Sequence, residues 1–284
     1  MVSPAAQAAD LTWSYAGGTA LASNPANWIG GVAPTDGDGV LFGNTTPTSP
    51  CTWDLALTIA SMSVSGSYAS TVTLTVDLTV SSGVWLGGGS SAMLDLNGHN
   101  LSVQGDWTVG SMKTTSTVAG STVTFYGTGT SNITRTGGGV ARFNYLVIDK
   151  TAGQTEQLLS DIEVFGLFTI LTGNHVAGKH SQHLHGGLLL TEGFLDVSVS
   201  TLVFVGDRPQ ALASNGEGGA TFIGAIFIQA PAAITLPGVQ VAVLVATQPS
   251  STLILQTPID PISITSMTIS GLAATSRIQI QSLV

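Results

Sequence analysis

One phrase occurs twice in this chain, 79 residues apart, and this internal repeat constrains the fold more than any other feature. Ser121–Lys150 and Ser200–Gln229 align without a gap. Aromatic residues recur where a core needs them, and glycines recur where the backbone turns. With a weaker echo, SMSVS at 61–65 and SMTIS at 266–270, the pattern predicts three degenerate units of about 80 residues, as in a repetitive scaffold. Eight positions are identical in the two copies: Ser121/Ser200, Thr122/Thr201, Phe125/Phe204, Gly127/Gly206, Gly137/Gly216, Gly139/Gly218, Ala141/Ala220 and Phe143/Phe222.

Composition and periodicity predict an all-β protein. Charged residues are 8% of the chain, against about 25% in an ordinary soluble domain. Gly, Ser and Thr stand in their place, and Thr, Val and Ile favour strands. In TVTLTVDLTV (71–80), apolar side chains alternate with Thr and Asp, so one face is dry and the other polar.

Three segments carry a resemblance to known proteins. FNYLVIDKTAG…LLSDIEVFGLFTILTG (143–173), preceded by STVTFYGTGTSNI and LDLNGHNLSVQGDW, resembles the β-solenoid repeats of large bacterial surface proteins. NPANWIGGVAPTDGDGVLF (24–42) is similar to the entry modules before such repeats. Similar chains occur among phage structural proteins. The resemblance implies a right-handed parallel β-helix-like solenoid with an N-terminal capping module. A β-sandwich or jelly roll remains the alternative, because alternation does not separate parallel from antiparallel pairing.

We expect three regions along the chain. Residues 1–52 form an entry and capping module, 53–219 the β-repeat body, and 220–284 an apolar C-terminal β region. The last region carries only Asp260 and Arg277 as charges. On a monomer it would expose large apolar patches, which predicts a subunit interface, most simply in a homotrimer. The tryptophans are expected in the core or in an interface rather than on a sugar-binding face.

The histidine-rich segment NHVAGKHSQHLHGG (174–187) offers one metal-site hypothesis. His183 and His185 are separated by one residue, so on a strand both side chains point to the same face. In a homotrimer with this strand at the axis, three such pairs would supply six imidazoles for a transition metal, an arrangement similar to that of phage spike tips. The alternative is a solvated, flexible loop that binds nothing. No other cofactor is expected.

No catalytic constellation is evident in the sequence. Polysaccharide lyases and hydrolases on β-helices need clustered carboxylates with Arg or Lys, and the sixteen acidic residues are scattered. Asp36 and Asp38 predict an Asx-turn rather than a calcium site. Cys51 is expected to be a small buried hydrophobe. An enzyme is therefore not expected.

Charge and hydropathy narrow the possible partners. The formal net charge of −9 opposes nucleic-acid binding, and no run approaches the ~20 apolar residues of a membrane-spanning helix. MVSPAAQAAD lacks the basic and apolar parts of a signal peptide, so a signal was either removed or never used.

These observations predict a non-enzymatic structural protein on the exterior of a phage virion, as a decoration, cement or appendage subunit. A secreted bacterial adhesin or matrix solenoid at the cell surface is the alternative, and a polysaccharide-active β-helix enzyme comes third. The expected partners are further copies of the chain, the major capsid protein or another virion protein, and a host-surface glycan.

Overall fold

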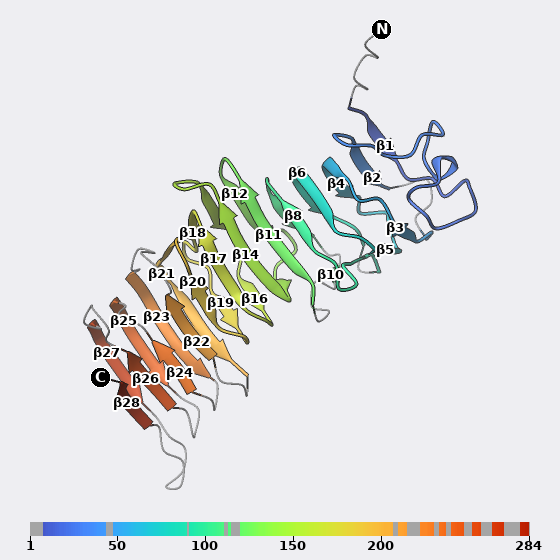
Figure 1. Cartoon of the computed structure of the whole chain (residues 1–284). Coiled ribbons are helices and arrows are strands. Elements are labelled where there is room, and N and C mark those ends of the chain that lie inside the picture. The colour runs from blue at the N-terminus through green and yellow to red at the C-terminus, as the bar shows by residue number, and fades with distance from the viewer. Residues whose placement is uncertain are drawn as a thin grey trace. The chain divides into compact units, whose positions relative to one another are not determined.

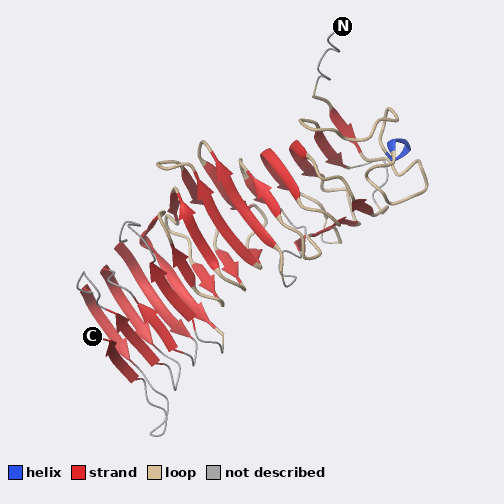
Figure 2. Ribbon diagram, in the orientation of Figure 1, coloured by secondary structure: helices blue, strands red, loops and turns tan. Residues whose placement is uncertain are grey.

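The protein is described from a computed structural model. The described residues are 8–43, 48–89, 91–110, 113–114, 120–206, 210–214, 222–229, 233–236, 240–246, 252–256, 263–269 and 279–283. The chain divides into two compact units, residues 1–122 (unit 1) and 123–284 (unit 2), and each is treated by itself. Figure 2 shows strands throughout both units, with one short helical turn at Pro25–Asn27. Within the described residues, no helix has the length and apolar character needed to cross a bilayer.

Unit 1 is a β-solenoid built from two parallel stacks (Figure 1). Val40 lies beside Met62, Met62 beside Val84, and Val84 beside Trp107, so one circuit of the backbone, here called a coil, takes 22 or 23 residues. The first stack contains β1 (Asp10–Thr12), β2 (Gly39–Phe42), β4 (Thr58–Val64), β6 (Leu78–Leu86), β8 (Leu101–Val103) and β9 (Trp107–Val109). The second contains β3 (Cys51–Trp53), β5 (Thr71–Leu74), β7 (Met93–Asp95) and β10 (Lys113–Thr114).

Alternating side chains form the strands of unit 1, and short polar corners end them. Val72 and Leu74 of β5 point into the core, while Thr71 and Thr73 are half-buried on the outer side. The alternation in 71–80 nevertheless belongs to two strands, because the chain leaves β5 after Leu74 and enters β6 at Leu78. The predicted turn at Asn97-Gly98 is confirmed. Both residues have positive φ, 49° and 83°, which Asn and Gly tolerate best.

Aromatic side chains fill the first coils of unit 1. The rings of Trp13 and Trp28 meet edge to face with centroids 5.2 Å apart, and Trp28 meets Trp53 at 6.4 Å. Phe42 packs against Tyr68 at 5.6 Å, and all five rings are buried. The buried indole nitrogens find backbone partners, since Nε1 of Trp28 donates to the Ala22 carbonyl at 2.7 Å. Aromatic burial on this scale is a large source of stabilisation for a small cross-section.

Unit 2 begins with coils of three strands, which stack into three faces (Figure 1). The β14 face contains β11 (Thr122–Gly127), β14 (Tyr145–Lys150), β17 (Phe168–Thr172), β20 (Leu188–Leu190), β22 (Gln210–Ser214), β24 (Ala233–Leu236), β26 (Thr252–Gln256) and β28 (Gln279–Leu283). The β15 face contains β12 (Ser131–Arg135), β15 (Thr155–Leu158), β18 (Asn174–Val176) and the start of β21 (Phe194–Val205). The β16 face contains β13 (Ala141–Phe143), β16 (Ile162–Val164), β19 (Gln182–Leu184), the end of β21, β23 (Phe222–Gln229), β25 (Gln240–Ala246) and β27 (Ser263–Ile269).

Every pairing between the strands of each unit is parallel, which confirms the solenoid and excludes an antiparallel sandwich for the described chain. In unit 2, Leu146 lies beside Phe168, Phe168 beside Leu188, and Leu188 beside Leu212, all with buried side chains. A coil here takes 20 to 24 residues. After β21 each coil contributes two described strands instead of three.

The predicted unit of about 80 residues is therefore wrong as the structural repeat. Both copies of the phrase consist of strands and turns, but matched segments lie on different faces. Ser131–Arg135 is β12 of the β15 face, whereas its counterpart Gln210–Ser214 is β22 of the β14 face. The phrase records a strand–turn–strand pattern and not the period at which coils stack.

The predicted C-terminal interface concerns residues 220–284, where the structure describes only the strands. β23 through β28 continue the parallel stacks of the β14 and β16 faces. Their side chains lie largely outside the described residues, so the apolar interface remains a prediction.

Candidate functional site

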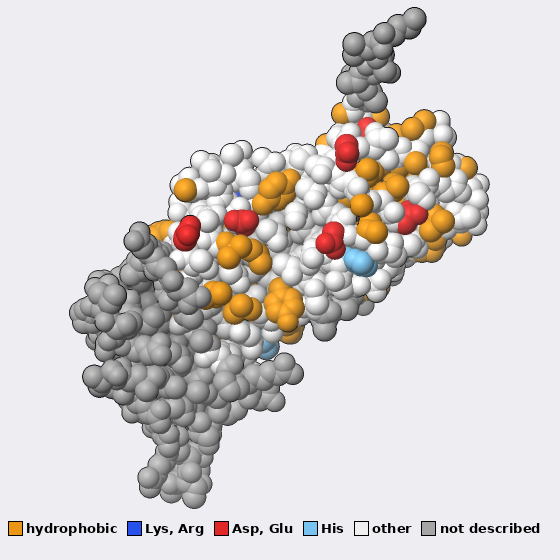
Figure 3. All heavy atoms as spheres, viewed as in Figure 1, with side chains coloured by type: hydrophobic (Ala, Val, Ile, Leu, Met, Phe, Trp, Pro, Cys, Tyr) orange, Lys and Arg blue, Asp and Glu red, His pale blue; other side chains and the backbone are white. Residues whose placement is uncertain are grey.

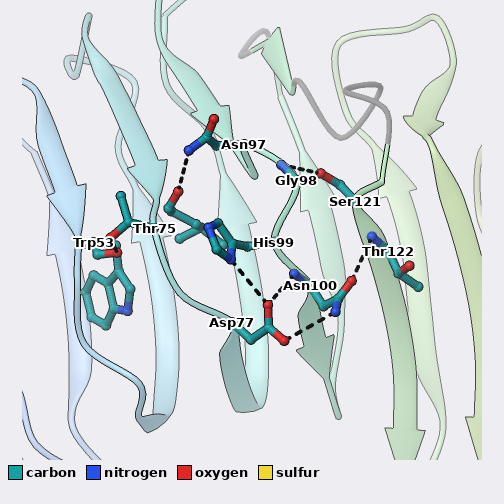
Figure 4. Close-up of polar contacts among 10 residues, drawn as sticks. Trp53, Thr75, Asp77, Asn97, Gly98, His99, Asn100, Ser121 and Thr122 are labelled. Carbon is teal, nitrogen blue, oxygen red and sulfur yellow. Dashed lines mark hydrogen bonds and ion pairs between the residues drawn. The ribbon is translucent and has the colours of Figure 1, made fainter.

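Acidic and amide side chains connect successive coils in unit 1, and Figure 4 shows the clearest example. Asp77 Oδ1 accepts the backbone N–H of Asn100 at 2.9 Å, and the side-chain amide of Asn100 donates to Asp77 Oδ2 at 3.2 Å. Asn100 Oδ1 accepts the backbone N–H of Thr122 at 3.3 Å, one coil further on. His99 Nδ1 lies 3.5 Å from Asp77 Oδ1. Polar side chains at this corner are thus used to join coils.

Backbone hydrogen bonds hold the carboxylates of unit 1 in the ionised form. The N–H of Asn100 is the main cause that lowers the pKa of Asp77. At Asp38, burial alone would raise the pKa, but hydrogen bonds from the backbone of Ala9 and from the backbone and hydroxyl of Thr35 outweigh it and lower the pKa. Carboxylates of this kind are poor proton donors at neutral pH, so neither is suited to general acid catalysis.

The predicted Asx-turn at Asp36 and Asp38 is wrong. An Asx-turn requires the side chain to accept the N–H two residues further on. Asp36 Oδ1 instead accepts the N–H of Thr58 at 2.7 Å, and Asp38 Oδ2 accepts the N–H of Thr35 at 2.8 Å. Both carboxylates fix the entry of the chain into β2.

Unit 2 encloses a polar cluster in its interior. Glu156 and His175 lie side by side in the register of β15 and β18, and His175 Nδ1 contacts Glu156 Oε2. His175 Nε2 lies 3.1 Å from Gln182 Oε1. The imidazole also meets the ring of Phe168 edge to face at 5.0 Å. The side chains of Glu156, His175 and Gln182 are fully buried, and Lys150 is fully buried in the same unit.

This interior cluster is only partly satisfied by hydrogen bonds. Glu156 Oε1 and Gln182 Nε2 have no hydrogen-bond partner among the described residues. Burying such groups is costly, and removing one member of a buried pair costs more still. Since no atom of the cluster reaches solvent, it cannot meet a substrate. It instead favours one register of β15, β18 and β19 over others.

The alternative reading of residues 174–187 as a solvated loop is wrong. The segment forms β18 and β19, with His175 inside the solenoid. His183 and His185 are half-buried, whereas Gln182 and Leu184 are buried, so the two histidines share the outer side of the β16 face as predicted. The structure brings them together and places His175 on the opposite side of the chain.

A charged and aromatic surface covers part of the β16 face. We call it the outer patch; its residues are Arg142, Tyr145, Glu163, Phe165, His183 and His185. In the parallel register, Glu163 lies between Arg142 of the preceding coil and His183 of the following coil. Arg142 Nε donates to Glu163 Oε2 at 2.8 Å, and His185 Nε2 lies 3.1 Å from Glu163 Oε1. Sequence reasoning missed this patch, because its members are about 20 residues apart along the chain.

Glu163 is the charged centre of the outer patch. Burial acting alone would raise its pKa, but hydrogen bonds from Arg142 and His185 outweigh that effect and lower the pKa. His185 therefore has a carboxylate partner within the chain. Among the described residues, no group of three or more His, Cys, Asp or Glu side chains is arranged to hold a metal. A metal between three copies of His183 and His185 stays a prediction.

The remaining candidate residues serve the core. Trp13, Trp28, Trp53 and Trp107 are buried as expected, while Trp85 is 45% exposed. Cys51 is buried, and burial raises the pKa of its thiol, which makes it a poor nucleophile. Figure 3 shows that the described surface is mostly uncharged, with isolated acidic side chains and small separate apolar areas.

Comparisons with known proteins identify no relative: no family model matches the chain, and neither does any curated protein or solved structure. The assignment of function therefore depends on the geometry of the residues.

Proposed function

We propose that this chain is a non-enzymatic structural subunit on the exterior of a phage particle, in the role of a decoration, cement or appendage protein. The observation that carries the proposal is the use of its polar chemistry. Asp36, Asp77 and Asp161 accept backbone N–H groups across coils, and Glu163 bonds to Arg142 of the coil before it. Side chains that could perform acid–base chemistry are thus spent on holding coils together.

The surface supports an exterior structural role. It is poor in charge and rich in hydroxyl groups, and its acidic excess opposes binding to nucleic acid. Parallel coils make a stiff body, because each strand is hydrogen-bonded to the coils before and after it. We propose that copies of the chain associate as a homotrimer through residues 220–284 and attach to the major capsid protein or another virion protein.

A bacterial adhesin or matrix protein at the cell surface is the second candidate. The outer patch favours it, since exposed rings next to fixed polar groups suit adhesion to a glycan. The sequence resemblance to repeats of bacterial surface proteins points the same way.

Immunogold electron microscopy separates the two candidates. Antibodies raised against the purified chain should label the outside of particles released from lysed cultures of the source organism. Label on cell walls and none on particles would support the adhesin and overturn the virion role. Analytical ultracentrifugation tests the assembly: we expect a mass of three chains of 28.8 kDa each, and a stable monomer at micromolar concentration would overturn the homotrimer.

A further inference from the structure

The outer patch concentrates groups that are rare in this chain. The whole protein has seven Lys and Arg residues and five histidines, yet Arg142, His183 and His185 meet around one carboxylate on one face. They come from three successive coils that are held in register by the β13–β16 and β16–β19 pairings. A solvated face of this charge-poor solenoid would not need such a gathering for stability, since exposed ion pairs contribute little.

Two aromatic rings extend the patch toward solvent. Phe165 is 38% exposed and Tyr145 is 39% exposed. The ring of Phe165 stacks on the imidazole of His185, with centroids 4.9 Å apart and planes 20° apart. The ring of Tyr145 lies against Gly166, where an added Cβ would come within 2.5 Å of Tyr145 Cε1. Both rings are therefore held in place by neighbours on adjacent coils while a large part of each stays accessible.

We propose that the outer patch binds a linear, neutral glycan, with sugar rings packed on Tyr145 and Phe165. Exposed aromatic rings pack well on the apolar faces of pyranoses, and the fixed Arg142, Glu163 and His183 side chains can exchange hydrogen bonds with hydroxyl groups. Neighbouring strands are about 4.8 Å apart, a spacing similar to the advance of one pyranose along a glycan. A glycan running across the strands would therefore meet equivalent groups on each coil.

Charge selects a neutral glycan over an acidic one. Within the patch, Arg142 and Glu163 neutralise each other at 2.8 Å. The chain as a whole carries a formal charge of −9, which repels polyanions such as uronate polymers. A protein partner fits less well, because the central side chains of the patch are polar and protein interfaces have charge-depleted centres.

Affinity electrophoresis of the full chain through gels that contain soluble polysaccharides tests the proposal. The probes are hydroxyethyl cellulose, glycol chitin, mannan and dextran, with polygalacturonate as the acidic comparison. We expect retardation by at least one neutral probe, weakened about tenfold in Tyr145→Ala and in Phe165→Ala. Phe194→Ala is the matched control, because Phe194 is equally exposed, at 40%, on the β15 face; its retardation should equal that of the wild type.

Arg142→Gln keeps the test valid if an aromatic variant misfolds, because the Arg142 side chain is 59% exposed. This variant should also weaken retardation while its circular dichroism spectrum stays unchanged. No retardation by any neutral probe, retardation by polygalacturonate alone, or equal retardation of all patch variants would each overturn the proposal. The proposal deepens the exterior role given above, but the gel assay uses the purified chain, so its outcome is independent of the immunogold result.

Discussion

The buried contact between Glu156 and His175 can be tested by a double-mutant cycle. Glu156→Leu leaves His175 Nδ1 without a partner in the interior, and His175→Leu leaves the Glu156 carboxyl without one. Removing one member of a buried pair costs about 3–5 kcal/mol, and an unpaired neutral group costs about 1–3 kcal/mol. We therefore expect each single variant to lower the free energy of unfolding by about 3 kcal/mol.

The double variant distinguishes a shared contact from two separate effects. If Glu156 and His175 acted independently, their costs would add to about 6 kcal/mol. Since they share one contact, we expect the double variant to cost about 3–4 kcal/mol, which is a coupling of about 2–3 kcal/mol. Gln157→Leu is the control, because Gln157 is the next residue of the same strand and its side chain is half-buried on the outer side; it should change stability by less than about 0.5 kcal/mol.

Urea unfolding followed by circular dichroism measures these costs. With an m-value of roughly 3 kcal/mol/M, a loss of 3 kcal/mol moves the midpoint about 1 M lower. Single variants that cost less than about 1 kcal/mol, or costs that add within about 0.5 kcal/mol, would refute the claim that this contact stabilises the register of the coils.

Three further predictions concern the packing of unit 1. Asp77 has a lowered pKa in the folded chain because of the Asn100 N–H, so its contribution to stability is present above the ordinary carboxyl pKa and is lost as pH falls through the folded value; Asp77→Asn should flatten this acidic part of a plot of melting temperature against pH, and an unchanged slope would contradict it. Gly105→Ala should lower the melting temperature strongly, because an added Cβ would lie 1.6 Å from the Ser82 carbonyl oxygen, whereas Gly66→Ala meets no atom closer than 3.5 Å and should be tolerated; similar melting temperatures for the two would rule out this packing. Cys51 should react with a thiol reagent only after unfolding, since burial raises the pKa of its thiol; labelling of the native chain within minutes would disprove its burial.

Hydrophobic alternation was sufficient to predict the solenoid, but it could not supply the coil period. Alternation tells which side chains point inward, as at Val72 and Leu74, and it says nothing about which residue stacks on which. Leu146, Phe168 and Leu188 form one inward column although they share no motif, because any well-shaped apolar side chain can fill such a position. Sequence identity at 79 residues therefore marked similar local patterns and not neighbours in space.

The polar interior of unit 2 was missed for a related reason. Glu156 stands two residues before the inward Leu158, so a strict period of two already assigns its side chain to the core. The assumption that a carboxylate faces water overrode that signal. The outer patch needed the register itself, because Arg142, Glu163 and His183 meet only after coils of about 20 residues have been closed.

β21 has a consequence for how forces and fluctuations travel through unit 2. It is a single strand of twelve residues whose start pairs with β18 and whose end pairs with both β19 and β23. In a solenoid, stability passes between nearest neighbours, and most coils can separate at a corner without pulling on a second face. At β21 there is no such corner, so fraying that starts among the two-stranded coils must break two stacks at once to pass it. The strand therefore acts as a rivet that couples the three-stranded and two-stranded coils of the unit.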